Sequence, residues 1–182
     1  MKSLRQLHRE SAALPLIADD ITELHAARLL LLLKVCGVGG RIEGLTKLAK
    51  LDFFVRYPDF FVRAAKHLNK QVSLTTREVD SEMVRHHYGP WDKRYYSVLP
   101  FLESHRLITV AKEGGAFVFA LTDEGKAAAK NLERRAEFSD QVGRMREVKR
   151  LFGQWKGTTL KDLVYHVFDD EVGKKALGEV IQ

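Results

Sequence analysis

Residues 107–126 read LITVAKEGGAFVFALTDEGK, and this stretch decides the fold. Leu107–Ala111 and Ala116–Leu121 are short runs rich in β-branched, aromatic and other apolar residues, as expected of strands. Glu113-Gly114-Gly115 lies between them and suits the tip of a hairpin. The hydroxyl of Thr122 can accept a hydrogen bond from a free amide in the first turn of a helix. The stretch therefore predicts two strands, a tight turn and a helix capped by Thr122.

A helix is expected ahead of the hairpin, because Tyr88-Gly89-Pro90 marks a turn and apolar residues then recur at helical spacing. This helix is expected to begin at Trp91, with a kink at Pro100, where proline removes a backbone donor. A helix, a glycine-tipped hairpin and a capped helix are typical of a winged helix. The stretch is similar to the end of a winged helix, in which a strand that begins Gly-Leu-Ile leads to a helix that begins Leu-Thr-x-x-Gly. Leu107-Ile108 and Leu121-Thr122-x-x-Gly125 match these two motifs, although Arg106 stands in place of the glycine of the first.

The rest of the chain predicts further helices on both sides of this core. They are expected after the capping residues Asp19 and Asp20 as far as Cys36, from about Arg41 to Tyr57, from Pro58 to Leu68, across the charged stretch from Glu133 to Trp155, and from Gly157 to Phe168. The predicted fold class is mainly α with a small β-hairpin (α+β), a winged helix with additional N- and C-terminal helices. The regions are residues 1–83 (N-terminal helical), 84–138 (winged-helix core) and 139–182 (C-terminal helical extension), expected to form one compact unit.

Composition narrows the class of protein. The 182 residues are 45% hydrophobic and 30% charged, which is ordinary for a globular chain. The net charge of +6 permits a nucleic-acid partner, but 24 acidic residues are mixed among 30 basic ones, and a protein that coats DNA is usually more one-sided. The N-terminus is too polar for a signal peptide, and no apolar run approaches the roughly 20 residues that span a bilayer. We expect a cytoplasmic protein without membrane contact.

No motif in the sequence indicates catalysis, a cofactor or a metal. His86 and His87 are adjacent, but neighbouring residues on a strand point to opposite faces and cannot easily bind one ion. Gly37–Gly40 precedes a helix but follows another helix, and it lacks the Gly-Lys-Ser/Thr ending of a phosphate loop. Cys36 is the only cysteine, so no internal disulfide and no cysteine-based zinc site can form within one chain. We expect a protein that is not an enzyme.

Basic and aromatic side chains are the candidates for binding. A winged helix that binds DNA would place the outer face of its second helix in the major groove, and a second basic run follows further along the chain. The candidate DNA-binding residues are Lys93, Arg94, Tyr96 and Ser97, with Arg144, Arg146, Lys149 and Arg150. Two cations beside Asp92 make few phosphate contacts, so the first set predicts weak DNA binding at most.

Large aromatic residues dominate the energetics of protein interfaces. The candidates for a partner interface are Phe54, Tyr57, Phe60, Phe61, Trp91 and Trp155. Packing in the core is the alternative interpretation for each of them.

RIEGLTKLAKLDFFV at residues 41–55, followed by YPDF at 57–60, resembles a stretch of the middle-component proteins of bacterial ABC-three-component defence systems, including the middle subunit of Lamassu. RHHYGPW at residues 85–91 fits the same pattern, and the resemblance covers about residues 20–130. It implies a non-catalytic winged-helix subunit beside an SMC-like ATPase and an effector, often a nuclease.

Two functions are therefore in competition. The first is an adaptor that joins an SMC-like ATPase to an effector nuclease in an antiphage or anti-plasmid defence complex, with any DNA contact made through that complex. The alternative is a winged-helix transcription regulator that binds DNA as a homodimer, using its other helices for dimer contacts.

Overall fold

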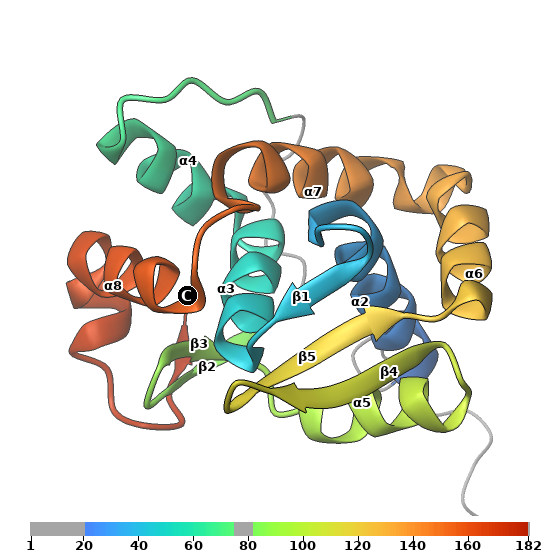
Figure 1. The fold of residues 1–182 in the computed structure, drawn as a ribbon. Helices are drawn as coiled ribbons and strands as arrows, with labels where there is room; N and C mark the ends of the chain where they lie inside the picture. The colour runs from blue at the N-terminus through green and yellow to red at the C-terminus, as the bar shows by residue number, and fades with distance from the viewer. Residues whose placement is uncertain (1–20, 75–81, 182) are drawn as a thin grey trace, which may run out of the picture.

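A computed structural model of the chain describes residues 21–74 and 82–181 (Figure 1). Within these residues the protein is mostly helical, with two small antiparallel sheets of three strands each. The α+β class expected from the sequence is thereby confirmed. The Asp19 and Asp20 side chains expected to start the first helix lie outside the described residues. In the part of the chain that is described, no helix is both long enough and apolar enough to cross a membrane.

The first described helix is a core helix. α2 (Thr22–Cys36) buries all five residues from Leu29 to Leu33, so neighbours surround it. The helix expected from Arg41 instead begins with a strand, β1 (Arg41–Glu43), and α3 (Leu45–Arg56) starts only after Gly44. The reason is long-range pairing: Ile42 lies opposite Phe119, and Gly44 adopts a φ of 88°, which a helix cannot contain.

Proline 58 opens the next helix as predicted, in the first-turn position where its missing N–H costs nothing. This helix, α4 (Pro58–His67), follows α3 after one residue. Every residue of α3 from Leu48 to Arg56 is buried, because α2, α4, α7 and α8 all pack around it.

A second hairpin precedes the helix that was expected to begin at Trp91. β2 (Met83–His86) pairs with β3 (Gly89–Trp91), and α5 (Tyr95–Ser104) begins only after a short turn. The predicted helix start was wrong because Trp91 pairs with Val84 across this hairpin. The far edge of β2 pairs with β6 (Val180–Ile181), near the end of the chain.

The hairpin predicted from the opening stretch is confirmed. β4 (Ile108–Glu113) pairs with β5 (Ala116–Leu121), and the glycines at the tip adopt positive φ angles. β5 also pairs with β1, so the sheet order is β1-β5-β4. The Thr122 hydroxyl accepts a hydrogen bond from the Gly125 amide at 2.9 Å and caps α6 (Asp123–Glu133).

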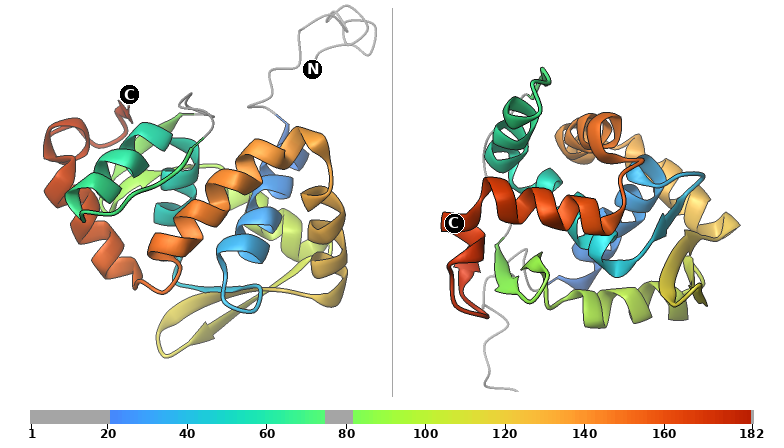
Figure 2. Two further views of the ribbon diagram at one scale, coloured as in Figure 1. Left: turned by 90° about the horizontal axis from the view of Figure 1, so that it is seen from above. Right: turned by 60° about the vertical axis from the view of Figure 1, so that its left-hand side comes forward.

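The C-terminal part of the chain wraps the same core. It consists of a 3-10 turn η2 (Ala136–Phe138), α7 (Ser139–Phe152), α8 (Gly157–Val167) and a π-helical turn η3 (Asp169–Gly173). Figure 2 shows α7 passing across α2 and α3, with α8 alongside α3 and α4. One hydrophobic core includes side chains from the first described helix, α2, to the last strand, β6.

Candidate interaction surface

Most of the aromatic residues proposed for a partner interface are core residues. Phe54, Tyr57 and Phe61 have no exposed surface, and Phe60 and Trp91 are 6% and 5% exposed. The phenylalanines of α3 and α4 stack on one another and on α7, with Phe54 and Phe152 at 4.8 Å between ring centroids. The expectation that these five residues contact a partner is therefore corrected, because all five side chains are packed in the hydrophobic core. Trp155 is half-buried and remains at the surface.

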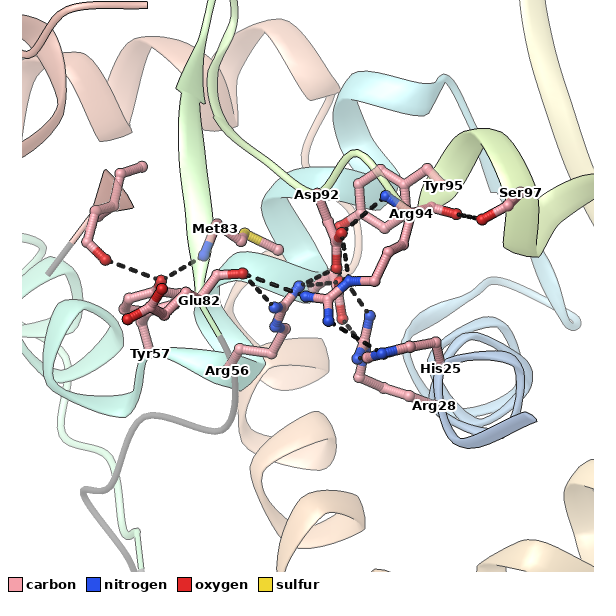
Figure 3. A network of polar contacts seen from close by, with 12 residues as sticks. His25, Arg28, Arg56, Tyr57, Glu82, Met83, Asp92, Arg94, Tyr95 and Ser97 are labelled. Carbon is pink, nitrogen blue, oxygen red and sulfur yellow. Dashed lines mark hydrogen bonds and ion pairs between the residues drawn. The ribbon is translucent and has the colours of Figure 1, made fainter. Parts of the chain in front are cut away.

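A buried ionic network joins α2 and α3 to Asp92, which lies between β3 and α5 (Figure 3). Arg28 donates from Nε to Asp52 at 3.0 Å, and Arg56 donates to Asp92 at 2.7 Å. The Tyr95 hydroxyl donates to the same Asp52 carboxylate at 2.6 Å. The four charged side chains are at most 7% exposed, so the network fixes the positions of these helices inside the core.

Arg94 belongs to this network and does not face a DNA groove. Its Nε donates to Asp92 at 2.8 Å, and a second nitrogen lies 3.0 Å from Nε2 of His25 (Figure 3). Burial raises the pKa of Asp92, but hydrogen bonds from Arg94 and the charge of Arg56 outweigh this effect and lower the pKa to about 2. The assignment of Arg94 to a DNA-binding face is corrected, since its guanidinium is held against Asp92 and His25.

The second basic set does not form one cationic face either. Arg144 is 8% exposed, so its guanidinium is buried in the fold. Lys149 donates to the backbone oxygens of Cys36 and Gly37 at the carboxyl end of α2, where the helix dipole favours a cation. On the exposed side Arg146 pairs with Glu133, and Arg150 pairs with Glu147. The burial of Arg144 and the backbone contacts of Lys149 correct the assignment of these two residues to a DNA-binding surface, whereas DNA contact by the exposed Arg146 and Arg150 stays a prediction.

The outer face of α5 remains exposed, and it carries little charge. Lys93, Tyr96 and Ser97 are exposed, as the sequence analysis required of a contact face. The Ser97 hydroxyl donates to the Arg94 carbonyl within the same turn. Lys93 is therefore the only cation of the first candidate set that is not committed to a carboxylate of the described chain.

An apolar groove lies between α5 and the β4–β5 hairpin, with a volume of about 270 Å³. At its rim Tyr96 is 65% exposed and Phe117 is 52% exposed. Glu103 is the charged residue of the lining. The residues that line the groove are Leu45, Tyr95, Tyr96, Leu99, Pro100, Glu103, Val110, Phe117 and Phe119. We name these residues the α5–hairpin groove; it can bury apolar side chains of another protein.

Neither the groove nor the network was predicted from the sequence. Phe117 was expected in a strand, but its exposure depends on the strands β1 and β4 that flank β5. Charged residues are usually exposed to solvent, and only the tertiary structure shows that Arg28, Asp52 and Arg56 face one another in the core. One signal was present: a carboxylate between the apolar residues Leu51 and Phe53 indicates a buried partner.

The described residues contain no group of three or more His, Cys, Asp or Glu side chains that could hold a metal ion. His86 stacks on Trp91 at 5.0 Å, and its ring lies 5.3 Å from that of His87. Comparison of the chain with protein-family models, with curated proteins and with solved structures found no match.

Proposed function

We propose that this chain is a non-catalytic winged-helix adaptor, which joins an SMC-like ATPase to an effector nuclease in a defence complex. The observation that carries the proposal is the α5–hairpin groove, an apolar surface at the place where a DNA-binding winged helix presents cations. The resemblance of residues 41–60 and 85–91 to middle-component proteins supplies the identity of the partners.

The order of the elements supports the winged-helix interpretation. α2, β1 and α3 are followed later by α5 and the β4–β5 hairpin, and β1 pairs with β5 to give the sheet order β1-β5-β4. α5 then corresponds to the helix that enters the major groove in DNA-binding members, and the hairpin corresponds to the wing.

The chemistry of this face favours protein over DNA. Duplex DNA binding depends on neutralising several phosphates, and of the first candidate set one uncommitted cation remains, Lys93 in the turn before α5, while α5 itself carries Glu103. Exposed aromatic rings beside an apolar groove are typical of the buried centre of a protein interface. Tyr96 and Phe117 supply those rings.

The test has two steps: a search of the neighbouring genes for an SMC-like ATPase, and a coexpression pull-down of that ATPase with this chain. We expect Phe117→Asp to weaken the complex about 30-fold or more, because a carboxylate would be placed in the apolar contact. The matched control is Tyr88→Asp, which changes an equally exposed aromatic residue at the β2–β3 turn, outside the groove. Affinity should change little between low and moderate salt, because burial of apolar surface is not screened.

The alternative, a transcription regulator, predicts a different partner and a different salt dependence. Its tightest interaction would be with duplex DNA, would weaken steeply with salt, and would depend on Lys93. Lys93→Glu is the informative variant, because charge reversal of Arg94 would place a carboxylate against Asp92 and disturb the fold. Specific, salt-sensitive DNA binding that Lys93→Glu abolishes, with no ATPase complex, would reverse the order of the two hypotheses.

A further inference from the structure

A second hollow lies on the opposite face of the β1-β5-β4 sheet. Along β1 and β5 the side chains of Ile42 and Phe119 face each other and are buried in the core, whereas Glu43 and Ala116 are exposed. Because side chains alternate between the two faces of a sheet, Ala116 and Phe117 point to opposite sides. The α5–hairpin groove is therefore on the inner side, and the hollow is on the outer side.

The outer hollow has a volume of about 560 Å³, roughly twice that of the groove. Its walls come from β1, the first turn of α3, the start of β5 and the turn between α7 and α8. The residues that line it are Val38, Arg41, Glu43, Lys47, Ala116, Gln154, Trp155, Lys156 and Gly157. Their formal charges are three positive and one negative, which sum to +2.

Lys47 and Lys156 can pair with an anionic ligand, whereas Arg41 is already paired. Arg41 already pairs with Glu113 at 2.6 Å and with Glu43 at 3.2 Å. Lys47 donates to the Gly153 carbonyl at 2.8 Å, which leaves further donor hydrogens of its ammonium group. Lys156 is exposed, and its side chain has no hydrogen bond or ion pair with any residue that the structure describes.

Burial lowers the pKa of Lys47, the charge of Lys149 lowers it further, and the charge of Glu43 acts in the opposite direction. A Cβ atom at Gly157 would lie 2.8 Å from the backbone nitrogen of Lys47, so the start of α8 packs directly against the first turn of α3. This contact brings Lys47 and Lys156 to one wall, where no side chain caps the first amides of α8.

We propose that the outer hollow is the docking site for an acidic segment of a second protein partner. A carboxylate of that segment pairs with Lys47 and Lys156, and a neighbouring apolar side chain packs against Trp155 and Val38. This inference rests on the proposed adaptor function, because it supplies the second of the two docking sites that an adaptor requires. The two sites differ in chemistry, one apolar and one cationic, so the two partners do not compete.

A protein segment fits this hollow better than nucleic acid does. A phosphate backbone needs a continuous track of cations, and here Glu43 and Glu113 stand beside Arg41 and interrupt it. The half-buried ring of Trp155 and the exposed Val38 provide apolar contacts for a side chain next to the carboxylate. An acidic segment with interspersed apolar residues matches both properties.

The experiment uses the full chain and a fluorescein-labelled ten-residue peptide of alternating aspartate and leucine. We expect anisotropy to report binding that weakens with salt, and Lys156→Glu to reduce the affinity about tenfold. The control is Lys130→Glu, an exposed lysine on α6 at the other end of α7, which should leave the affinity unchanged. Tryptophan fluorescence measured with unlabelled peptide should change on binding in the wild type and not in Trp155→Phe.

Further arms separate the alternatives. A peptide with asparagine in place of aspartate should not bind measurably, and inorganic phosphate or a DNA duplex should bind more weakly than the acidic peptide. Tighter binding of DNA or phosphate, no binding of the acidic peptide, or equal affinity in Lys156→Glu would each overturn the proposal. Phe117→Asp should retain the acidic peptide while losing the ATPase, so a failure at one site is distinguishable from a failure at the other.

Discussion

Lys50 and Arg56 are two fully buried cations on the same helix, and their surroundings are opposite. Arg56 lies 2.7 Å from the Asp92 carboxylate and 3.4 Å from that of Asp52, and it also donates to the Glu82 carbonyl. Lys50 donates from Nζ to the Pro90 carbonyl at 2.9 Å and pairs with no carboxylate of the described chain.

The difference appears in the pKa values. Burial lowers the pKa of both groups, but the charges of Asp52 and Asp92 outweigh that effect for Arg56, whose pKa is raised. Nothing offsets burial for Lys50, whose pKa falls to about 7. A buried positive charge is thus retained in this core where carboxylates surround it, and a lone ammonium tends to lose its proton.

The largest effect is expected from removing the carboxylate shared by the network. Asp52→Asn leaves Arg28 and Arg56 with Asp92 as the remaining buried carboxylate, and uncompensated buried charge is strongly destabilising. We expect a loss of about 3–5 kcal/mol in the free energy of unfolding, measured by urea denaturation at pH 7. The exposed Asp123→Asn is the control, and a loss below about 1 kcal/mol for Asp52→Asn would contradict the role of the network.

The buried Lys50 makes the free energy of unfolding depend on pH. Its pKa is lower in the folded chain, so between about pH 7 and its ordinary value of 10.5 the unfolded chain binds more protons. Stability therefore rises with pH across this window, by up to roughly 1.4 kcal/mol per pH unit. Lys50→Met should lack this rise and should exceed the wild type at pH 6 by about 2 kcal/mol, even after the Pro90 carbonyl loses its donor.

The measurement is the difference in unfolding free energy between the wild type and Lys50→Met from pH 6 to pH 10. Buried Tyr57 and Tyr95, whose pKa values burial raises, are present in both proteins, so their contributions largely cancel. We expect the advantage of the variant to shrink and reach zero or change sign by pH 10. Parallel pH profiles would show that Lys50 keeps its proton, and the contrast with Arg56 would fail.

Local signals in the sequence were sufficient for part of the fold. Two short runs rich in β-branched and aromatic residues, two adjacent glycines and a threonine cap are enough to place β4, β5 and the start of α6. Neither β1 nor β3 could be placed, because Arg41–Glu43 and Gly89–Trp91 are only three residues each. Their partners are β5 and β2, so pairing in the folded protein, and not local preference, decides these segments.

The candidate site was less predictable, because burial depends on every neighbouring element. The sequence of α3 predicts one buried stripe and leaves further aromatic residues for the surface. In the structure α2, α4, α7 and α8 pack around the helix, and these aromatic residues are buried as well. The sequence predicts that Arg94 and Lys149 are surface cations. In the structure Arg94 lies beside the Asp92 carboxylate, and Lys149 lies at the carboxyl end of α2. The sequence did place Tyr96 on the exposed face of its helix, because the spacing of Tyr95, Val98 and Leu99 defines the buried face.

The smallest expected effect is a difference in the free energy of unfolding between variants of two cations on α7, Lys149 and Arg146. Lys149 caps the carboxyl end of α2, whereas Arg146 is 66% exposed and pairs with Glu133 on the surface. We expect Lys149→Met to lower the free energy of unfolding by about 1 kcal/mol, because the carbonyls of Cys36 and Gly37 lose their shared donor. Arg146→Met should change it by less than about 0.5 kcal/mol, since an exposed ion pair contributes little. Equal losses, read from urea denaturation of the two variants, would show that Lys149 is as solvated as Arg146 and would return it to the candidates for a binding surface.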